Sequence, residues 1–444
     1  MLALMIASGI GISLTPDRRK GDVELWTFAR MHALMYDPLL ARWNADRPDD
    51  TVEMTLFAEG ALERRLLSSF MARTAVADLI EVERKMAGRA FSGPADAVGF
   101  VDLTDRLRDA GLLDQINPAS FSPWTSRGRI FGLPHDVHPV MLVYRADIVD
   151  RLGIDLSGVE TWDDFFRAMA PVMTDENGDG EPDRYILSLW ETHPDAIEVL
   201  MLQAGGRFFN EEGEPDIASE INARTIATIV SWTTGPGRLT ADAMPFSASG
   251  NKLKLDGYVV ADLMPDWMCN IWKNEMPQLS GKVRVMPLPA WDRGGRRTSV
   301  WGGTMLGIST SARNPDACWD VAQHLYLSKS LAQELYRTGD IITPFRAHWD
   351  DAVFDEPDPY FQGQRKGRMF IELAGDVPLR SSSPYNTIAR ERVRDATVSL
   401  ASYARRTRTY DAESLRPEAM RLLVEAQAAV ERLLNRNQFI KEPQ

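Results

Sequence analysis

Hydrophobic and polar residues in the N-terminal part of the chain follow two alternating periods. Short runs rich in β-forming residues stand at 22–29 (DVELWTFA), 51–60 (TVEMTLFAEG) and 77–83 (ADLIEVE). Between these runs, residues 37–49 and 61–73 space their apolar side chains as one face of a helix. The order β, α, β, α, β predicts an α/β fold with a parallel sheet and helices on its faces.

The carboxyl ends of these three strands are where a ligand is expected, because the crevice of a parallel sheet lies beyond them. Trp26, Glu59 and Glu83 stand at these ends, together with Phe28. Aromatic rings stack on the apolar faces of sugars, and carboxylates bind their hydroxyls. Each residue also has a structural interpretation: Trp26 as sheet core, and Glu59 or Glu83 as a helix N-cap or a solvated loop charge.

Two passages rich in glycine and proline, at 134–139 and 286–303, divide the rest of the chain. A second α/β region lies between them, and strand-like TMLGIST follows the second passage. The chain closes at 416–436 with an amphipathic helix whose recurring apolar positions include Leu422, Val424 and Val430. The pattern therefore places unit boundaries at these two passages.

The amino-acid composition excludes several classes of protein. The 444 residues are 44% hydrophobic and 25% charged, which is ordinary for a folded soluble protein. The net charge of −13 argues against nucleic-acid binding, which needs a cationic surface. With Cys269 and Cys318 as its only cysteines, the chain has no disulfide framework. One bridge between them is the alternative to two buried thiols, which we favour.

The first fourteen residues, MLALMIASGIGISL, carry no charge. This stretch is shorter than the roughly 18 to 20 residues that span a bilayer but suits the apolar region of a secretory signal. Basic residues follow it at 18–20 rather than precede it, which departs from a typical signal. We interpret residues 1–21 as a signal or anchor segment and expect export, with a buried strand as the alternative.

The segment 175–183, DENGDGEPD, resembles a calcium loop. The oxygen ligands would come from positions one, three, five, seven and nine: Asp175, Asn177, Asp179, Glu181 and Asp183. Position twelve is Ile186, so the bidentate carboxylate of such loops is missing. The alternative is an acidic turn whose side chains bond their own backbone. Calcium would have a structural role here, and we expect no required cofactor.

Motifs of the common catalytic machineries are absent from the sequence. There is no Gly-x-Ser-x-Gly elbow, no phosphate loop and no His-Glu-x-x-His. His135 and His138 stand close together, but no third metal ligand is evident near them and an extended backbone would direct them differently. We therefore expect a binding protein rather than an enzyme.

Several passages together resemble the extracellular solute-binding proteins of ABC importers, in the carbohydrate-binding group that includes maltose, arabino-oligosaccharide and glycerol-3-phosphate binders. They are GRIFGLPHDVHPVMLVYRADIVDRLGID with TWDDF, LMLQAGGRFFNEEGEP, VADLMPDWM, WGGTMLGIST and NPDACWDVAQHL. The resemblance runs from about residue 22 to the C-terminus and rests on the order and spacing of these passages. It implies two α/β lobes joined by crossover hinge strands, the first comprising 22–135 plus 290–345 and the second 136–289 plus 346–444.

The resemblance also points to ligand-binding residues in the cleft between the lobes. Trp267 follows a strand and a proline at the position where the family's tryptophan stacks on the ligand. Trp301 and Gly303 stand where the chain returns to the first lobe, and the glycines allow close backbone approach. Trp190, Asp136 and Arg346 complete the candidates. The alternatives are a hinge-packing role for Trp301 and an exposed surface position for Arg346.

The expected function is that of an extracytoplasmic, periplasmic or extracellular component that binds a sugar, oligosaccharide or polyol and delivers it to membrane permease subunits. We expect a monomer, with the N-terminal segment as a membrane tether if it is retained. One alternative is a lyase or glycosidase that uses Glu59, Glu83 and Asp136; another is a tethered sugar receptor for signalling. Since Arg346 is the only cleft cation that the sequence suggests, a neutral sugar is preferred.

Overall fold

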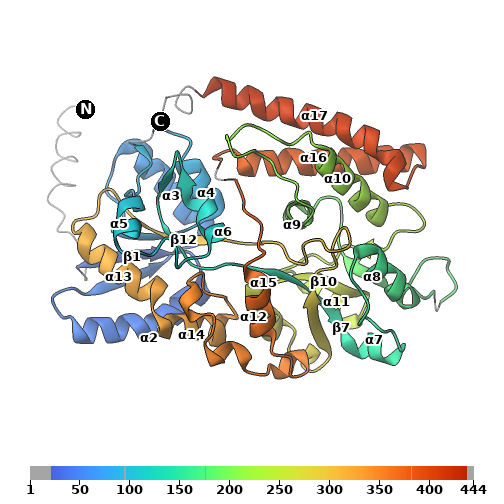
Figure 1. Cartoon of the computed structure of the whole chain (residues 1–444), viewed down its shortest axis with the longest axis horizontal. Coiled ribbons are helices and arrows are strands. Elements are labelled where there is room, and N and C mark those ends of the chain that lie inside the picture. The colour runs from blue at the N-terminus through green and yellow to red at the C-terminus, as the bar shows by residue number, and fades with distance from the viewer. Residues whose placement is uncertain (1–21, 95–96, 176, 382, 438–444) are drawn as a thin grey trace, which may run out of the picture.

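Two five-stranded sheets, each with its own core, organise the chain (Figure 1). The computed structural model describes residues 22–94, 97–175, 177–381 and 383–437. The expected signal or anchor segment 1–21 lies outside the described residues. Among the helices of the described part, no helix is both long and apolar enough to cross a membrane.

The first sheet has the order β2-β1-β3-β12-β6. Its strands are β1 (Val23–Thr27), β2 (Val52–Leu56), β3 (Leu79–Glu83), β6 (Leu133–Pro134) and β12 (Thr304–Ile308). The first three strands are parallel, as their alternation with helices predicts, whereas β12 runs antiparallel to β3 and β6. The flanking elements are α2 (Arg30–Asp46), α3 (Glu59–Ala72), α4 (Arg84–Ala90), α5 (Thr104–Asp109), α6 (Pro118–Phe121), η2 (Ser122–Trp124), β4 (Thr125–Ser126), β5 (Arg129–Ile130), α13 (Pro315–Leu327) and α14 (Lys329–Gly339).

The second sheet has the order β11-β7-β10-β8-β9. Its strands are β7 (Val140–Arg145), β8 (Tyr185–Ser188), β9 (Thr240–Ala241), β10 (Val259–Pro265) and β11 (Val283–Pro287). All seven residues of β10 are buried, as expected for a central strand covered on both faces. Its surrounding helices are α7 (Ala146–Arg151), α8 (Trp162–Met169), η3 (Ala170–Val172), α9 (Pro194–Gln203), α10 (Glu220–Thr233), α11 (Ala248–Asp256), α12 (Asp266–Glu275) and η4 (Pro277–Leu279).

The chain passes between the two sheets more than once. Residues 135–139 lead from β6 to β7, and residues 288–303 lead back from β11 to β12. These two crossings meet in an antiparallel bridge between Pro139 and Val300. Beyond α14 the chain returns to the second core, to which Ile342 and Phe354 belong. The first two crossings coincide with the glycine- and proline-rich passages of the sequence, whereas the return beyond α14 does not.

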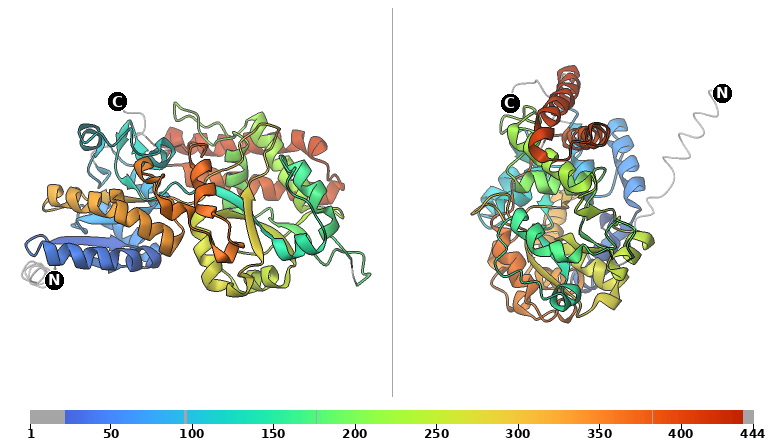
Figure 2. Two further views of the ribbon diagram at one scale, coloured as in Figure 1. Left: turned by 60° about the horizontal axis from the view of Figure 1, so that its bottom comes forward. Right: turned by 90° about the vertical axis from the view of Figure 1, so that its right-hand side faces the viewer.

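The C-terminal part of the chain packs on the second core. It comprises η5 (Arg346–His348), η6 (Ala352–Asp355), η7 (Pro359–Phe361), α15 (Lys366–Ala374), α16 (Asn386–Thr407) and α17 (Ala412–Arg436). The two long helices α16 and α17 lie side by side along one edge, next to α10 (Figure 2). The buried stripe of α17 is Leu415, Ala419, Leu423, Ala426 and Val430. The predicted helix is confirmed, but its predicted apolar position Val424 is 52% exposed.

The two cysteines belong to different cores. Cys318 lies in the core of the first sheet and Cys269 in that of the second, and both are free and buried. Burial raises the pKa of the Cys318 thiol to about 12, so it stays protonated at neutral pH. The two buried thiols favoured from the sequence are what the structure shows.

Candidate ligand-binding site

Residues 301–303, at the end of the second crossing, join both lobes. Their three consecutive carbonyl oxygens accept, in chain order, the indole N–H of Trp267 at 2.8 Å, the Nη1 of Arg380 at 2.5 Å and the backbone N–H of Arg84 at 3.2 Å. Trp267 begins α12 of the second lobe, Arg84 begins α4 of the first, and Arg380 precedes α16. Residues 301–303 therefore hold side chains and backbone from both lobes together at the candidate site.

Gly302 and Gly303 make this convergence possible. Their φ angles are 116° and 135°, a region in which a side chain is strained. A Cβ on Gly302 would lie 2.6 Å from Cδ2 of His138, and one on Gly303 would lie 2.9 Å from Nη2 of Arg380. The sequence predicted Gly303 as a point of close approach, and the group that approaches it is the Arg380 guanidinium.

An aromatic wall lies beside these glycines on the second lobe. It consists of Trp190, His193, Phe246, Trp267 and Trp301. Neighbouring rings have centroids 4.5 to 6.1 Å apart, and the rings of Phe246 and Trp267 are nearly parallel, 12° from each other. The wall grades from buried to open, because Trp301 is 7% exposed and Phe246 is 58% exposed.

Three members of the aromatic wall, Trp190, Trp267 and Trp301, were predicted from the sequence as separate candidates. The structure brings them together and adds His193 and Phe246. Burial lowers the pKa of His193 to about 4, so its imidazole is neutral and joins the wall as an uncharged ring. Phe246 has a left-handed φ of 57° before α11, which no sequence period marks.

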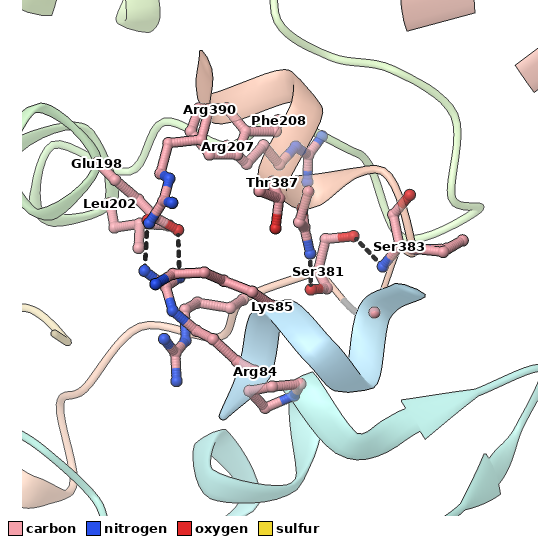
Figure 3. A pocket seen from close by; sticks show the side chains of 15 residues that line it. Arg84, Lys85, Glu198, Leu202, Arg207, Phe208, Ser381, Ser383, Thr387 and Arg390 are labelled. Carbon is pink, nitrogen blue, oxygen red and sulfur yellow. Dashed lines mark hydrogen bonds and ion pairs between the residues drawn. The ribbon is translucent and has the colours of Figure 1, made fainter. Parts of the chain in front are cut away.

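A cationic cavity opens between the lobes, and Arg380, which donates to Gly302, is part of its lining. Its lining includes five cations and one carboxylate: Arg84, Lys85, Arg207, Arg380, Arg390 and Glu198. Figure 3 shows Arg84 and Lys85 on α4 facing Glu198 and Arg390 across the cavity. Measured to the centres of water-sized spheres, its volume is about 40 Å³, enough for only a few waters.

A buried ion pair connects the lobes across the cationic cavity. Both terminal nitrogens of Arg84 donate to the Glu198 carboxylate, at 2.8 and 2.9 Å, whereas Arg390 on α16 pairs with Asp195 on α9 within the second lobe. Burial would raise the pKa of Glu198, but the guanidinium of Arg84 outweighs it and lowers that pKa to about 2. Glu198 is therefore ionised at neutral pH and holds α9 against α4.

Arg380 is the exception in this cavity. It is 9% exposed, and among the described residues no carboxylate oxygen lies within 4.0 Å of its guanidinium. Its Nη1 donates to Gly302, but its Nε has no hydrogen-bond acceptor in the described part of the chain. Burial and the nearby charge of Arg84 lower the pKa of Arg380 to about 10. No sequence pattern pointed to this residue, because it stands in an irregular segment.

Glu59 and Glu83 meet at the carboxyl edge of the first sheet, as predicted. Together with Phe28 and Lys85 they line a second, smaller hollow. The Glu83 carboxylate accepts the backbone N–H of Lys85 at 2.7 Å and so caps α4. This is the structural interpretation named for Glu83 from the sequence, and Glu59 lies 3.7 Å from the Nζ of Lys85.

Asp136 lies buried in the first crossing, within a hinge triad that we define as Asp136, His138 and Asp266. His138 sits between the two carboxylates, with its Nε2 2.8 Å from Asp136 and its Nδ1 2.8 Å from Asp266. Asp266 also accepts the backbone N–H of Ile342 at 2.8 Å. Because Asp136 is 5% exposed and bonded to His138, its carboxylate faces the triad rather than an open cleft.

His135 takes part in a neighbouring cluster instead of pairing with His138. Nitrogens of His32 and His135 and a carboxylate oxygen of Glu81 lie within 4.8 Å of one another, a spacing also found around metals. The Glu81 carboxylate already accepts hydrogen bonds from the hydroxyls of Tyr36 and Tyr326, and the Nδ1 of His32 lies 3.0 Å from it. Burial would raise the pKa of Glu81, but the neighbouring His32, His135 and Thr27 outweigh it and lower that pKa to about 2. We interpret the cluster as a buried polar network around an ionised Glu81.

Two predicted site residues lie elsewhere. Trp26 is 2% exposed in the core of the first sheet, where its indole N–H donates to Glu24 at 2.7 Å. Arg346 is exposed, and its guanidinium donates to the carbonyl of Asp114. Neither residue lines the cationic cavity, and the structural alternatives named for both from the sequence describe these positions.

The acidic loop lies between η3 and β8 and is largely exposed. Both oxygens of Asp175 accept backbone N–H groups, from Gly178 at 2.6 Å and Gly180 at 2.9 Å. The side chain of Asn177 bonds Asp183 at 2.8 Å. These are the self-bonded turns expected from the second interpretation of this segment, and calcium binding stays a prediction.

The chain matches the model of the bacterial extracellular solute-binding protein family over residues 29–331, and it belongs to this family. The family consists of binding proteins, so the enzymatic alternative is not supported. The chain is 23% identical over 390 residues to an arabinooligosaccharide-binding protein of Halalkalibacterium halodurans, covering 85% of each chain. It is 24% identical to a protein of the same name from Bacillus subtilis, covering 71% of each.

Solved structures share the two-lobed fold. The sugar-binding protein MalE from Xanthomonas citri superposes with a TM-score of 0.73 at 15% identity, covering 93% of this chain and 99% of that one. An extracellular solute-binding protein of family 1 gives a TM-score of 0.72 at 19% identity, covering 91% and 99%. The predicted fold class is thereby confirmed, and the family places the protein outside the cytoplasm.

Proposed function

We propose that the protein binds a carbohydrate between its lobes and delivers it to the permease subunits of an ABC transporter. The observation that carries this proposal is the aromatic wall, which offers stacked rings of graded exposure and is joined through residues 301 and 302 to Arg380 of a polar cavity. Sugars need both kinds of surface, apolar rings for their C–H faces and polar groups for their hydroxyls. Curated relatives that are named for arabinooligosaccharide binding support the same class of ligand.

The lobes would act as two bodies. We take the first as 22–135 plus 290–345 and the second as 136–289 plus 346–444, with residues 134–139 and 286–303 as the hinge. The cationic cavity has too little room for a sugar ring, so entry requires the lobes to separate and the pair Arg84 and Glu198 to part. Closure around the ligand would restore this pair, and the closed form would dock on the permease.

We further propose that the protein acts as a single copy and that residues 1–21 direct its export or hold it at the membrane.

Isothermal titration calorimetry with arabino-, malto- and galacto-oligosaccharides tests the proposal. Phe246→Ala removes the exposed end of the aromatic wall, and we expect it to weaken binding about 10-fold, the value of one stacking contact of about 1.4 kcal/mol. Leu34→Ala is the matched control, because Leu34 is 52% exposed on α2, outside the site. If no saccharide binds, neutral or acidic, or if both variants weaken binding equally, the proposal is wrong.

A further inference from the structure

We propose that the carbohydrate carries a carboxylate and that this group binds Arg380 inside the cationic cavity. The inference rests on the proposed function, since it names the class of sugar for the same site. It replaces the neutral sugar that the sequence favoured when Arg346 was its only candidate cation. What supports it is an imbalance of charge at one buried side chain.

The other cations of the cavity are compensated by the protein itself. Four of them have carboxylate partners: Arg84 with Glu198, Lys85 with Glu59, Arg207 with Asp216, and Arg390 with Asp195. Arg380 has no carboxylate within 4.0 Å in the part of the chain that the structure describes. Its guanidinium nevertheless donates to Gly302 within residues 301–303, where the two lobes and the aromatic wall meet.

A buried guanidinium without a counter-charge is unfavourable, because the protein interior does not replace the water that it loses. The carbonyl of Gly302 accepts a hydrogen bond from Nη1 of Arg380. The edge of the guanidinium formed by Nε and Nη2 is not used by this bond. Neither of these two nitrogens has a hydrogen-bond acceptor among the described residues. That edge is a planar pair of donors, which matches the two oxygens of a carboxylate.

The size of the cavity fits the same group. About 40 Å³ accommodates a few waters or a planar carboxylate, but no sugar ring. The indole of Trp267 and the guanidinium of Arg380 are bonded to adjacent carbonyls, those of Trp301 and Gly302. A uronate whose acid group enters the cavity would therefore leave its ring at the aromatic wall, outside the arginines.

Calorimetry on matched sugars tests the inference. The probes are disaccharides of galacturonate, glucuronate and mannuronate, each beside the neutral hexose disaccharide of the same linkage. At least one uronate is expected to bind about 10- to 100-fold more tightly than its neutral partner, as for a hydrogen-bonded charge pair. Hexose 6-phosphates form a third arm, and tighter binding of these than of any uronate would overturn the carboxylate assignment.

Variants locate the effect. Arg380→Gln should abolish the preference for the uronate over its neutral partner, and Arg380→Lys should restore part of it, since charge returns without the planar fork. Arg346→Gln, at an exposed arginine away from the cavity, is the control and should keep the full preference. The melting temperature of ligand-free Arg380→Gln should equal or exceed that of the wild type, because an uncompensated buried charge is gone.

The outcomes separate this inference from the proposed function. Neutral saccharides that bind as tightly as the uronates would overturn the inference and leave the proposed function intact. A preference for uronates that survives in Arg380→Gln would also overturn it. Failure of every saccharide, neutral or acidic, would refute the proposed function itself.

Discussion

The hinge triad and the cationic cavity both bury charged side chains at the boundary between the lobes, yet they balance charge differently. In the triad, one imidazole lies between two carboxylates at 2.8 Å from each. In the cavity, Arg380 has no carboxylate within 4.0 Å among the described residues. A cluster in which every charged side chain contacts an opposite charge serves the fold, whereas a cation that lacks such a partner is suited to receive one. The experiments below test this contrast, from the largest effect to the smallest.

Removing the imidazole of His138 should have the largest effect. His138→Ala leaves the carboxylates of Asp136 and Asp266 buried and facing each other without a cation. We expect the free energy of unfolding, measured by urea titration, to fall by about 3–5 kcal/mol. His324→Ala is the control, because His324 is partly exposed and no carboxylate contacts it in the described structure. A loss below about 1 kcal/mol would mean that the triad does not stabilise the hinge.

The charge of His138 should also appear in the pH dependence of stability. Burial would lower its pKa, but Asp136 and Asp266 outweigh burial and raise the pKa to about 9 from the usual 6.5. A raised pKa stabilises the folded state fully below about pH 6.5, and this contribution is lost as the pH rises through about 9. Between pH 6.5 and 9.5 the wild type should therefore lose up to about 3 kcal/mol more than His138→Gln.

Urea titrations of both proteins at several pH values give this difference directly. Parallel curves of unfolding free energy against pH for wild type and His138→Gln would show that the imidazole is not charged in the folded protein. The contrast between the hinge triad and Arg380 would then be wrong.

A substitution at Gly303, which packs against Arg380, should have a smaller effect and tests the cationic cavity. Gly303→Ala places a Cβ at a φ of 135° and 2.9 Å from Nη2 of Arg380. We expect a loss of roughly 1–3 kcal/mol in unfolding free energy and weaker ligand binding, since the guanidinium must shift. Gly375→Ala is the matched control, because its φ is −69° and no heavy atom lies within 4 Å of its added Cβ. Equal behaviour of the two variants would contradict the close packing at Gly303.

Most of the fold could be predicted from the sequence, because strands and helices follow from the local spacing of hydrophobic residues. Runs of alternating and helical periodicity predicted the parallel β1, β2 and β3, and the glycine- and proline-rich passages fell at the crossings. Val424 shows the limit of such patterns. A helical face predicted from periodicity alone can be rotated, since the helix buries the side that its neighbours require.

Only part of the candidate site could be predicted from the sequence. Trp267 follows a strand end, and Trp301 and Gly303 lie at the end of the second crossing; the family resemblance together with these chain positions suggested them. The arginines gave no such signal, because Arg84, Arg380 and Arg390 come from distant segments and an isolated arginine is most often a surface residue. One clue was present: Arg84 directly follows the third strand, at the edge where ligands bind.

The three consecutive carbonyl groups of residues 301–303 have a practical consequence. The indole of Trp267 is bonded to one carbonyl and the proposed acid-binding arginine to the next. A guest that settles on the arginine changes the surroundings of that indole at once. Intrinsic fluorescence should thus report occupancy without any attached dye, which makes the protein a starting point for an optical sensor.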